Sequence, residues 1–373
     1  MADWDCGDED EDWFYESITR YNLLRMFDFE NTPLHLQLSD AKSICVASRD
    51  SSGRNDILEL SLPEKLTVPP EQEGLVKSCD FKMKCGGYTK SPLFQMEVLF
   101  EKKQVLTSEK NEFGVAIYDL GSEKPGVVSW IGRTLCDLVS PRISYNKGSL
   151  VAMVSTDRED LVLMSTDDSR IKESIKWTQG DGNGELIKPE FVSPNAVSLC
   201  GMKTGTTPVF DVRSKHTSCC ILLGQAEPCD KTWTVASSFL SSPHSDDTAD
   251  LTKLALVSSL GTVIIYDLRN IQEPVCKGNI DHNMNGSNPP YLLPICVKFC
   301  PTKTSTVSVS GLDENVYVCD VTFPELKTIF VHDGHCKHRT ANSTLTVSHL
   351  WYEDVIISAS ENTSVHCWQF KVT

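Results

Sequence analysis

Residues 355–370 read Val-Ile-Ile-Ser-Ala-Ser-Glu-Asn-Thr-Ser-Val-His-Cys-Trp-Gln-Phe. The stretch holds two apolar runs, one starting at Val355 and one ending at Trp368, with a short polar segment between them. Apolar runs joined by a tight polar turn are typical of a β-hairpin, and Asn362 stands where a turn tolerates left-handed backbone. The sequence therefore predicts two antiparallel strands here.

Similar strand pairs recur along the whole chain. The last core residue of each copy serves as a marker, and the markers are Leu60, Tyr118, Ser165, Phe210, Tyr266, Cys319 and Trp368. They lie 45 to 58 residues apart. A repeat of this period indicates seven units built alike, which form one ring rather than several separate domains.

These units resemble the blades of WD-repeat proteins, in which four short strands end on an aromatic–Asp pair. The clearest copies are Tyr118-Asp119, Phe210-Asp211 and Tyr266-Asp267, while the last two units read Cys319-Asp320 and Trp368-Gln369. The resemblance implies an all-β fold, a seven-bladed WD-repeat β-propeller spanning residues 26–373.

The family's opening Gly-His pair is kept at Gly334-His335. The resemblance implies a hydrogen-bond network within the last blade, formed by His335, Ser358, Asn362 and Trp368. Because Asn replaces the family's Asp, one charge-assisted bond becomes a neutral and weaker one. A Gly86-Gly87 pair takes the place of Gly-His in an early blade, where we expect a turn with positive φ.

The N-terminal region differs from the repeats. Residues 1–12 are strongly acidic, which predicts a disordered tail. Residues 13–25 are predicted to form a helix that packs on the propeller's own rim, since Phe14, Ile18, Tyr21 and Leu24 fall on one helical face. Residues 26–29 then read as a strand that completes the last blade and closes the ring.

Composition limits the environment and the partners. No apolar run reaches the roughly 20 residues of a membrane span, so we expect a soluble cytoplasmic protein. The 15 cysteines are irregularly spaced and several fall in predicted strands, as for reduced core thiols. A net charge of −16 repels phosphate backbones, which disfavours direct nucleic-acid binding. Protein partners are expected instead.

No catalytic pattern fits the residues. A phosphate-binding Gly-x-x-x-x-Gly-Lys-Ser/Thr loop, a Gly-x-Ser-x-Gly elbow and a His-Glu-x-x-His helix are all missing from the sequence. His332, His335, Cys336 and His338 are residue types that bind zinc, but their spacing fits no common closed site and Lys337 and Arg339 would repel a cation. We therefore expect no catalytic residue, cofactor or metal.

Several stretches are similar, in the same order, to those of one subfamily of WD-repeat proteins. They are Asp12-Trp13, Glu16-Ser17, Ile57 to Pro63, Asp80-Phe81-Lys82 and Gly86-Gly87. The similarity implies a scaffold that helps to assemble the RNA endonuclease module of the Integrator complex in the cytoplasm. The implied partners are the endonuclease subunit and its inactive paralogue.

Other functions remain open at this point. The same resemblance also implies a role in microtubule organisation, with localisation at spindle poles and the cleavage furrow during division. Because microtubules are acidic, such a role would be indirect for a chain of this charge. An enzyme would instead show turnover or a stoichiometric metal. The candidate partner-binding residues are those of the acidic run and the residue after it: Asp8, Glu9, Asp10, Glu11, Asp12 and Trp13.

Overall fold

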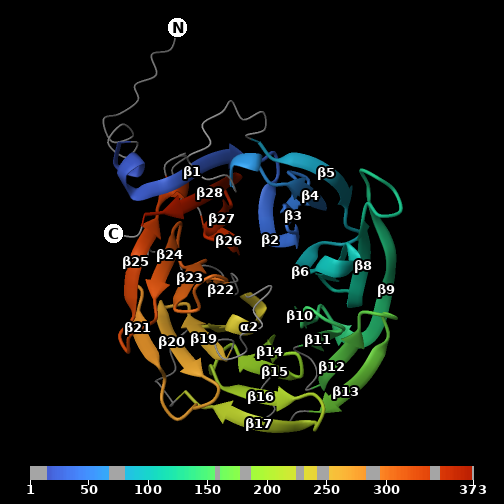
Figure 1. Cartoon of the computed structure of the whole chain (residues 1–373). Helices are drawn as coiled ribbons and strands as arrows, with labels where there is room; N and C mark the ends of the chain where they lie inside the picture. The colour runs from blue at the N-terminus through green and yellow to red at the C-terminus, as the bar shows by residue number, and fades with distance from the viewer. Residues whose placement is uncertain are drawn as a thin grey trace.

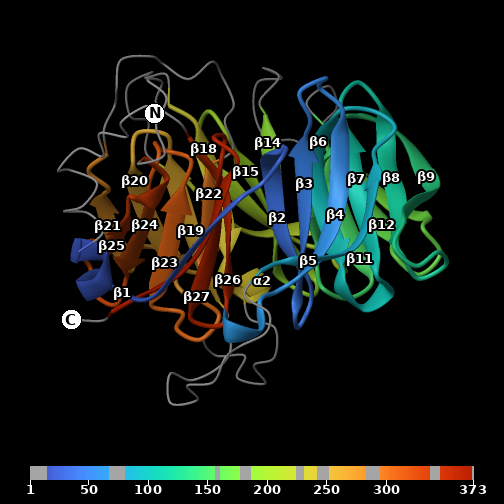
Figure 2. The ribbon, with the colours of Figure 1, turned by 90° about the horizontal axis from the view of Figure 1, so that it is seen from above.

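The computed structural model describes most of the chain. The described residues are 15–66, 80–155, 160–176, 186–223, 231–241, 252–282, 295–336 and 345–371. They form seven four-stranded antiparallel sheets arranged as blades around one axis. Figures 1 and 2 show the ring from its face and from its side. The predicted β-propeller is therefore confirmed.

Each blade is numbered by its place along the chain, and blade seven takes its outer strand from the N-terminus. The strands are β2 (Thr32–Asp40), β3 (Ser43–Arg49), β4 (Asn55–Ser61) and β5 (Lys82–Tyr88) in blade one; β6 (Leu93–Leu99), β7 (Gln104–Glu109), β8 (Phe113–Leu120) and β9 (Val128–Val139) in blade two; β10 (Arg142–Tyr145), β11 (Leu150–Val154), β12 (Asp160–Ser165) and β13 (Ile171–Lys176) in blade three; β14 (Ile187–Ser193), β15 (Ala196–Gly201), β16 (Thr207–Asp211) and β17 (His216–Ile221) in blade four; β18 (Trp233–Ser237), β19 (Lys253–Ser258), β20 (Thr262–Asp267) and β21 (Cys276–Asn279) in blade five; β22 (Cys296–Phe299), β23 (Thr306–Ser310), β24 (Val316–Asp320) and β25 (Lys327–His332) in blade six; and β26 (Thr346–Tyr352), β27 (Val355–Ser360), β28 (Ser364–Phe370) and β1 (Tyr21–Asp28) in blade seven.

Short helical elements join some strands. They are η1 (Glu64–Leu66), η2 (Phe100–Lys102), η4 (Gly334–Cys336) and α2 (Ser238–Ser241). Among the described residues, no helix is both long and apolar enough to cross a bilayer.

The seven sequence markers all lie in the third strand of their blade, from Leu60 in β4 to Trp368 in β28. The third strand of each blade is paired on both edges and has a neighbouring blade on each face. Its apolar run is therefore the clearest sequence pattern in a degenerate repeat. This explains why weak copies such as Ser165 could still be placed.

The hydrophobic core lies between the blades. In β3, Ile44 and Val46 join a cluster with blade seven, while Cys45 and Ala47 join a cluster with blade two. Successive side chains of a strand point to opposite faces, so both faces of a blade are covered only by its neighbours. The ring therefore has to close before every blade is buried.

The strand β1 closes the ring by pairing antiparallel with β28, with Phe27 opposite Val365 and Asp28 opposite Ser364 (Figure 1). The prediction of a closing strand at residues 26–29 is confirmed in position, but this strand begins earlier, at Tyr21. The predicted helix over residues 13–25 is too long: helix occupies residues 15–20 of the described chain, and the tail at 1–12 lies outside the described residues.

The physical reason for this error is the tertiary pairing. Tyr21 and Leu24 do bury apolar surface, as the helical pattern predicted, but they do so from a strand whose backbone groups are bonded to β28. Ile18, the third member of the expected helical face, is 58% exposed rather than packed on the rim. Arg20, at the end of the helix, is bonded to Asp333 and to the carbonyl of Val331, and Lys371 donates to the carbonyl of Ile18.

The prediction that Gly86-Gly87 forms a turn with positive φ is wrong. Both residues lie within β5, and neither has positive φ. The pair is instead required by close approach, because a Cβ on Gly87 would lie 2.4 Å from the carbonyl oxygen of Val128 at the start of β9. Gly86 also forms a parallel bridge with Val127. The outer strand of blade one thus touches blade two backbone to backbone.

Candidate functional site

The four residues of the expected network lie together in blade seven. The indole Nε1 of Trp368 donates to Ser358 Oγ at 3.0 Å, and Ser358 Oγ is 2.8 Å from Nε2 of His335. The amide of Asn362 donates to the backbone carbonyl of His335 at 3.0 Å. These bonds fix the loop that holds His335, which lies in η4 between β25 and β26.

Ser364, which sequence reasoning missed, connects His335 to Asn362. Its hydroxyl is 2.6 Å from His335 Nδ1 and donates to Asn362 Oδ1 at 2.5 Å. The donors then run in one direction, from Trp368 through Ser358, His335 and Ser364 to Asn362. The hydroxyl bridges the His335 ring and the amide oxygen of Asn362, accepting from the first and donating to the second. A Ser two residues after Asn362 was the available signal.

A second network of the same composition links blade six to blade seven, and the sequence reasoning did not find it. Nε1 of Trp351 donates to Ser308 Oγ at 2.7 Å, and His349 bonds Ser308 through Nε2 at 2.7 Å and Ser310 through Nδ1 at 2.8 Å. The His and the Trp lie on the same strand, β26, so no family spacing marked them.

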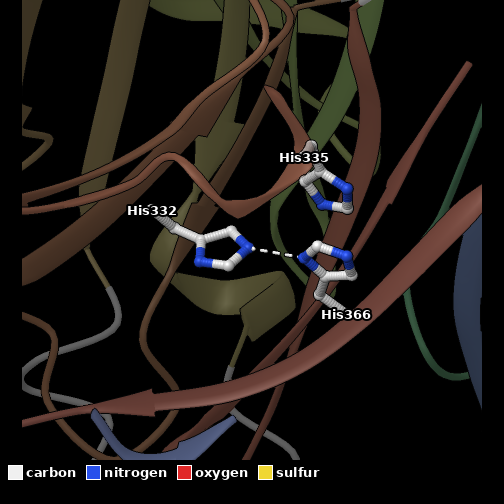
Figure 3. A group of neighbouring side chains, drawn as sticks. All are labelled: His332, His335 and His366. Atoms are coloured by element: carbon white, nitrogen blue, oxygen red, sulfur yellow. Dashed lines mark hydrogen bonds between the residues drawn. The ribbon is translucent and has the colours of Figure 1, made fainter. Parts of the chain in front are cut away.

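Two further buried histidines, His332 and His366, lie beside His335 of the first network (Figure 3). The nearest ring nitrogens of the three histidines all lie within 4.8 Å of one another. Nε2 of His332 is 3.0 Å from Nδ1 of His366, and Nδ1 of His332 is 2.8 Å from the hydroxyl of Tyr21. The cluster therefore joins the last strand of blade six, the third strand of blade seven and the closing strand β1.

Burial sets the protonation states in this cluster. It lowers the pKa of His332 well below its ordinary value, and the charges of His366 and Arg20 act in the same direction. Burial also raises the pKa of Tyr21, so the phenol stays protonated beside Nδ1 of His332. A neutral imidazole that accepts at one nitrogen and donates at the other is the form that fits these two bonds.

The three histidines are a candidate metal centre by composition, but their bonding does not fit one. Both nitrogens of His335 are engaged by Ser358 and Ser364, and both nitrogens of His332 are engaged by Tyr21 and His366. The rings of His335 and His366 are stacked at 3.9 Å, so their in-plane lone pairs run parallel rather than converge. Within the described residues, the hydrogen bonds of the cluster connect blade six to blade seven.

The remaining residues of the zinc-type pattern cannot be placed in this geometry. His338 and the side chain of Cys336 lie outside the described residues, as do Asp8, Glu9, Asp10, Glu11, Asp12 and Trp13. His366, which completes the cluster, is far from His332 in sequence. Only its alternation with Trp368 along one strand could have pointed to it.

One carboxyl near the axis of the ring has the ionisation of a possible acid or base. Burial raises the pKa of Glu97 to about 7. Its two oxygens accept from the amides of Gln37 and Gln95 at 3.2 and 3.4 Å. The same glutamines bond the backbone of the next blade, Gln37 at Val98 and Gln95 at Ile143. Glu97 therefore belongs to a set of side chains that tie neighbouring innermost strands together.

Comparisons with known proteins give a consistent result. No family model matches the chain. The chain is 26% identical to the Integrator complex assembly factor WDR73 of Danio rerio, over 98% of this chain and 97% of that protein. It is 25% identical to the Xenopus laevis protein of the same name, over 95% and 96%, and 21% identical to that of Homo sapiens, over 97% and 98%.

The matches cover 95–98% of this chain, in agreement with the subfamily resemblance expected from the sequence. The chain is a seven-bladed β-propeller that resembles, over almost its whole length, proteins named Integrator complex assembly factor WDR73.

Proposed function

We propose that this chain is a non-catalytic scaffold that assists assembly of the Integrator complex, by holding its RNA endonuclease subunit and the inactive paralogue of that subunit together in the cytoplasm. The observation that carries the proposal is the similarity, over nearly the full chain, to proteins named Integrator complex assembly factor. A propeller suits the task because its rigid ring offers several separate surfaces for protein contact.

The interior of the ring supports a structural role for the residues that could have done chemistry. His332, His335 and His349 each bond two partners, and Glu97 is held by two glutamine amides. Groups bonded in this way hold the blades in place, whereas a general acid or base must reach a substrate. The surface that binds protein partners is therefore expected on the outside of the ring.

The test is reconstitution with purified proteins. The endonuclease subunit and its paralogue are mixed with and without this chain, and the amount of their heterodimer is followed by size-exclusion chromatography. We expect the chain to form a stable complex with the pair. We also expect the heterodimer to form faster or in larger amount when the chain is present. If the chain neither binds the pair nor changes its yield, the proposal is wrong. Fractionation of cells tests the cytoplasmic location.

The alternative role in microtubule organisation is separated by co-sedimentation with purified tubulin polymer. With a net charge of −16, direct binding to an acidic polymer is disfavoured, and we expect the chain to stay in the supernatant at moderate salt. Its appearance in the pellet at stoichiometric amounts would favour the cytoskeletal role.

A further inference from the structure

The outer strands of the blades share one irregularity that allows the blades to be compared. In blades one, two, three, four and six, the fourth strand has one extra residue opposite the third strand. The extra residues are Lys84, Ile131, Lys172, Ser218 and Ile329. A bulge turns its residue outward at the rim, so a polar residue is expected there.

Blade two departs from this rule. The bulge in β9 places both Trp130 and Ile131 toward solvent, with 43% and 45% of their surface exposed. Tyr88 and Val127 are also exposed, on the stretch where β5 meets the start of β9. Apolar residues of this size seldom gather on a solvent face without a partner.

Blade six also has an apolar residue at its bulge, but there the chain itself covers the rim. Ile329 and Phe330 pack against a cluster that contains Tyr21. The Tyr21 ring meets Phe330 at 5.1 Å, and the guanidinium of Arg20 lies 5.2 Å from the same ring. The short segment around Arg20 and Tyr21 thus shows how an apolar bulge on this rim is covered. Trp368 and Phe370 also stack on Phe330, at 5.6 and 5.2 Å.

Blade two has the exposed apolar residues Trp130 and Ile131, and its own Lys90 supplies the charged side chain next to them. The ammonium of Lys90 lies 3.1 Å from the centre of the Trp130 ring and is exposed. A segment that covers Trp130 and Ile131 would therefore need apolar side chains together with a carboxylate for Lys90. Lys90 is a local cation beside these apolar residues on a chain whose net charge is −16, and a carboxylate on the docking segment would pair with it directly.

We propose that the surface formed by Tyr88, Lys90, Val127, Trp130 and Ile131, the blade-two rim, is a docking site for a short apolar, acid-flanked segment of a protein partner. The position of β9 on the outside of the ring leaves this surface open to a large partner (Figure 1). The inference rests on the proposed function for the identity of that partner, the endonuclease subunit paired with its paralogue.

The experiment measures binding of the purified endonuclease pair to the full chain by biolayer interferometry. Ile131→Asp and Lys90→Glu change the blade-two rim. Ile171→Asp and Lys172→Glu make the same changes on the outer strand of blade three, where Ile171 is the counterpart of Trp130. All four positions are exposed, so each variant should fold, which thermal unfolding checks.

We expect Ile131→Asp and Lys90→Glu each to raise the Kd at least tenfold, the usual effect of removing a central interface contact, and the blade-three variants to stay within about twofold. If the wild-type chain binds and all four variants bind as well, the docking site is wrong and the proposed function stands. Equal losses in both pairs of variants also overturn the site. If the wild-type chain does not bind the pair, the proposed function fails and this inference fails with it.

Discussion

The buried histidine His332 makes stability depend on pH in a direction that can be stated in advance. Its side chain is 0% exposed, and its pKa in the folded protein lies well below the ordinary 6.5. The unfolded chain therefore binds a proton at this residue as the pH falls through 6.5, while the folded protein does not. Stability is complete above this pH and is lost progressively below it.

The size of the effect follows from the two protonation equilibria. Between pH 7.0 and 5.5, one histidine that stays neutral in the folded state lowers the free energy of unfolding by about 1.3 kcal/mol. His35, whose pKa burial lowers to about 4, adds a dependence of the same sign. Comparison with His332→Gln isolates His332, because His35 is present in both proteins.

The assay is urea denaturation of the wild-type chain and of His332→Gln at both pH values. The variant should be less stable at pH 7.0, because Tyr21 and His366 lose a partner, but its stability should fall by about 1.3 kcal/mol less on acidification. Equal losses in the two proteins would refute the assignment of a neutral, buried His332.

Three further predictions concern separate features. Ser358→Ala removes the partner of Trp368 and His335, two buried groups, and should lower the free energy of unfolding by roughly 2–6 kcal/mol in urea titrations, whereas the exposed Ser218→Ala should change it by less than about 0.5 kcal/mol. Gly87→Ala should lower stability by about 1–3 kcal/mol because its Cβ meets Val128, while Gly132→Ala, which has open space around it, should not; similar melting temperatures would contradict the close-approach argument. Deletion of residues 1–12 should leave the melting temperature unchanged and weaken binding to the endonuclease pair, and unchanged binding would count against a role for the acidic run.

The fold could be predicted because its strongest signal is local. A third strand such as Val263 to Tyr266 is buried on both faces, so its apolar run survives even where the family's Gly-His and aromatic–Asp pairs are lost. The closing strand was harder to bound. The spacing of Tyr21 and Leu24 fits one face of a helix, and it also fits a strand that pairs with β28. The strand forms because its partner is available, although Phe370 lies 349 positions from Tyr21 in the sequence.

Within the candidate site, only the residues that match the family's motif could be predicted from the sequence. His335, Ser358, Asn362 and Trp368 have the spacing of the family's network. Ser364 adds a bridge between His335 and Asn362, and His349 builds its own network from another strand. The Gly86-Gly87 pair was misinterpreted because its cause lies in a neighbouring blade. A glycine required by a neighbouring backbone looks, in sequence, like a glycine required by a turn.

Because β1 pairs with β28, the strand at Tyr21–Asp28 is made on the ribosome well before its partner at Ser364–Phe370. At usual elongation rates of about 5–20 residues per second, that interval is roughly 20–70 s, during which blade-facing apolar surfaces have no neighbour on one side. A shortened translation product that lacks β28 would leave β1 unmatched, so the circular architecture makes the burial of β1 depend on synthesis of β28 before any binding partner is met.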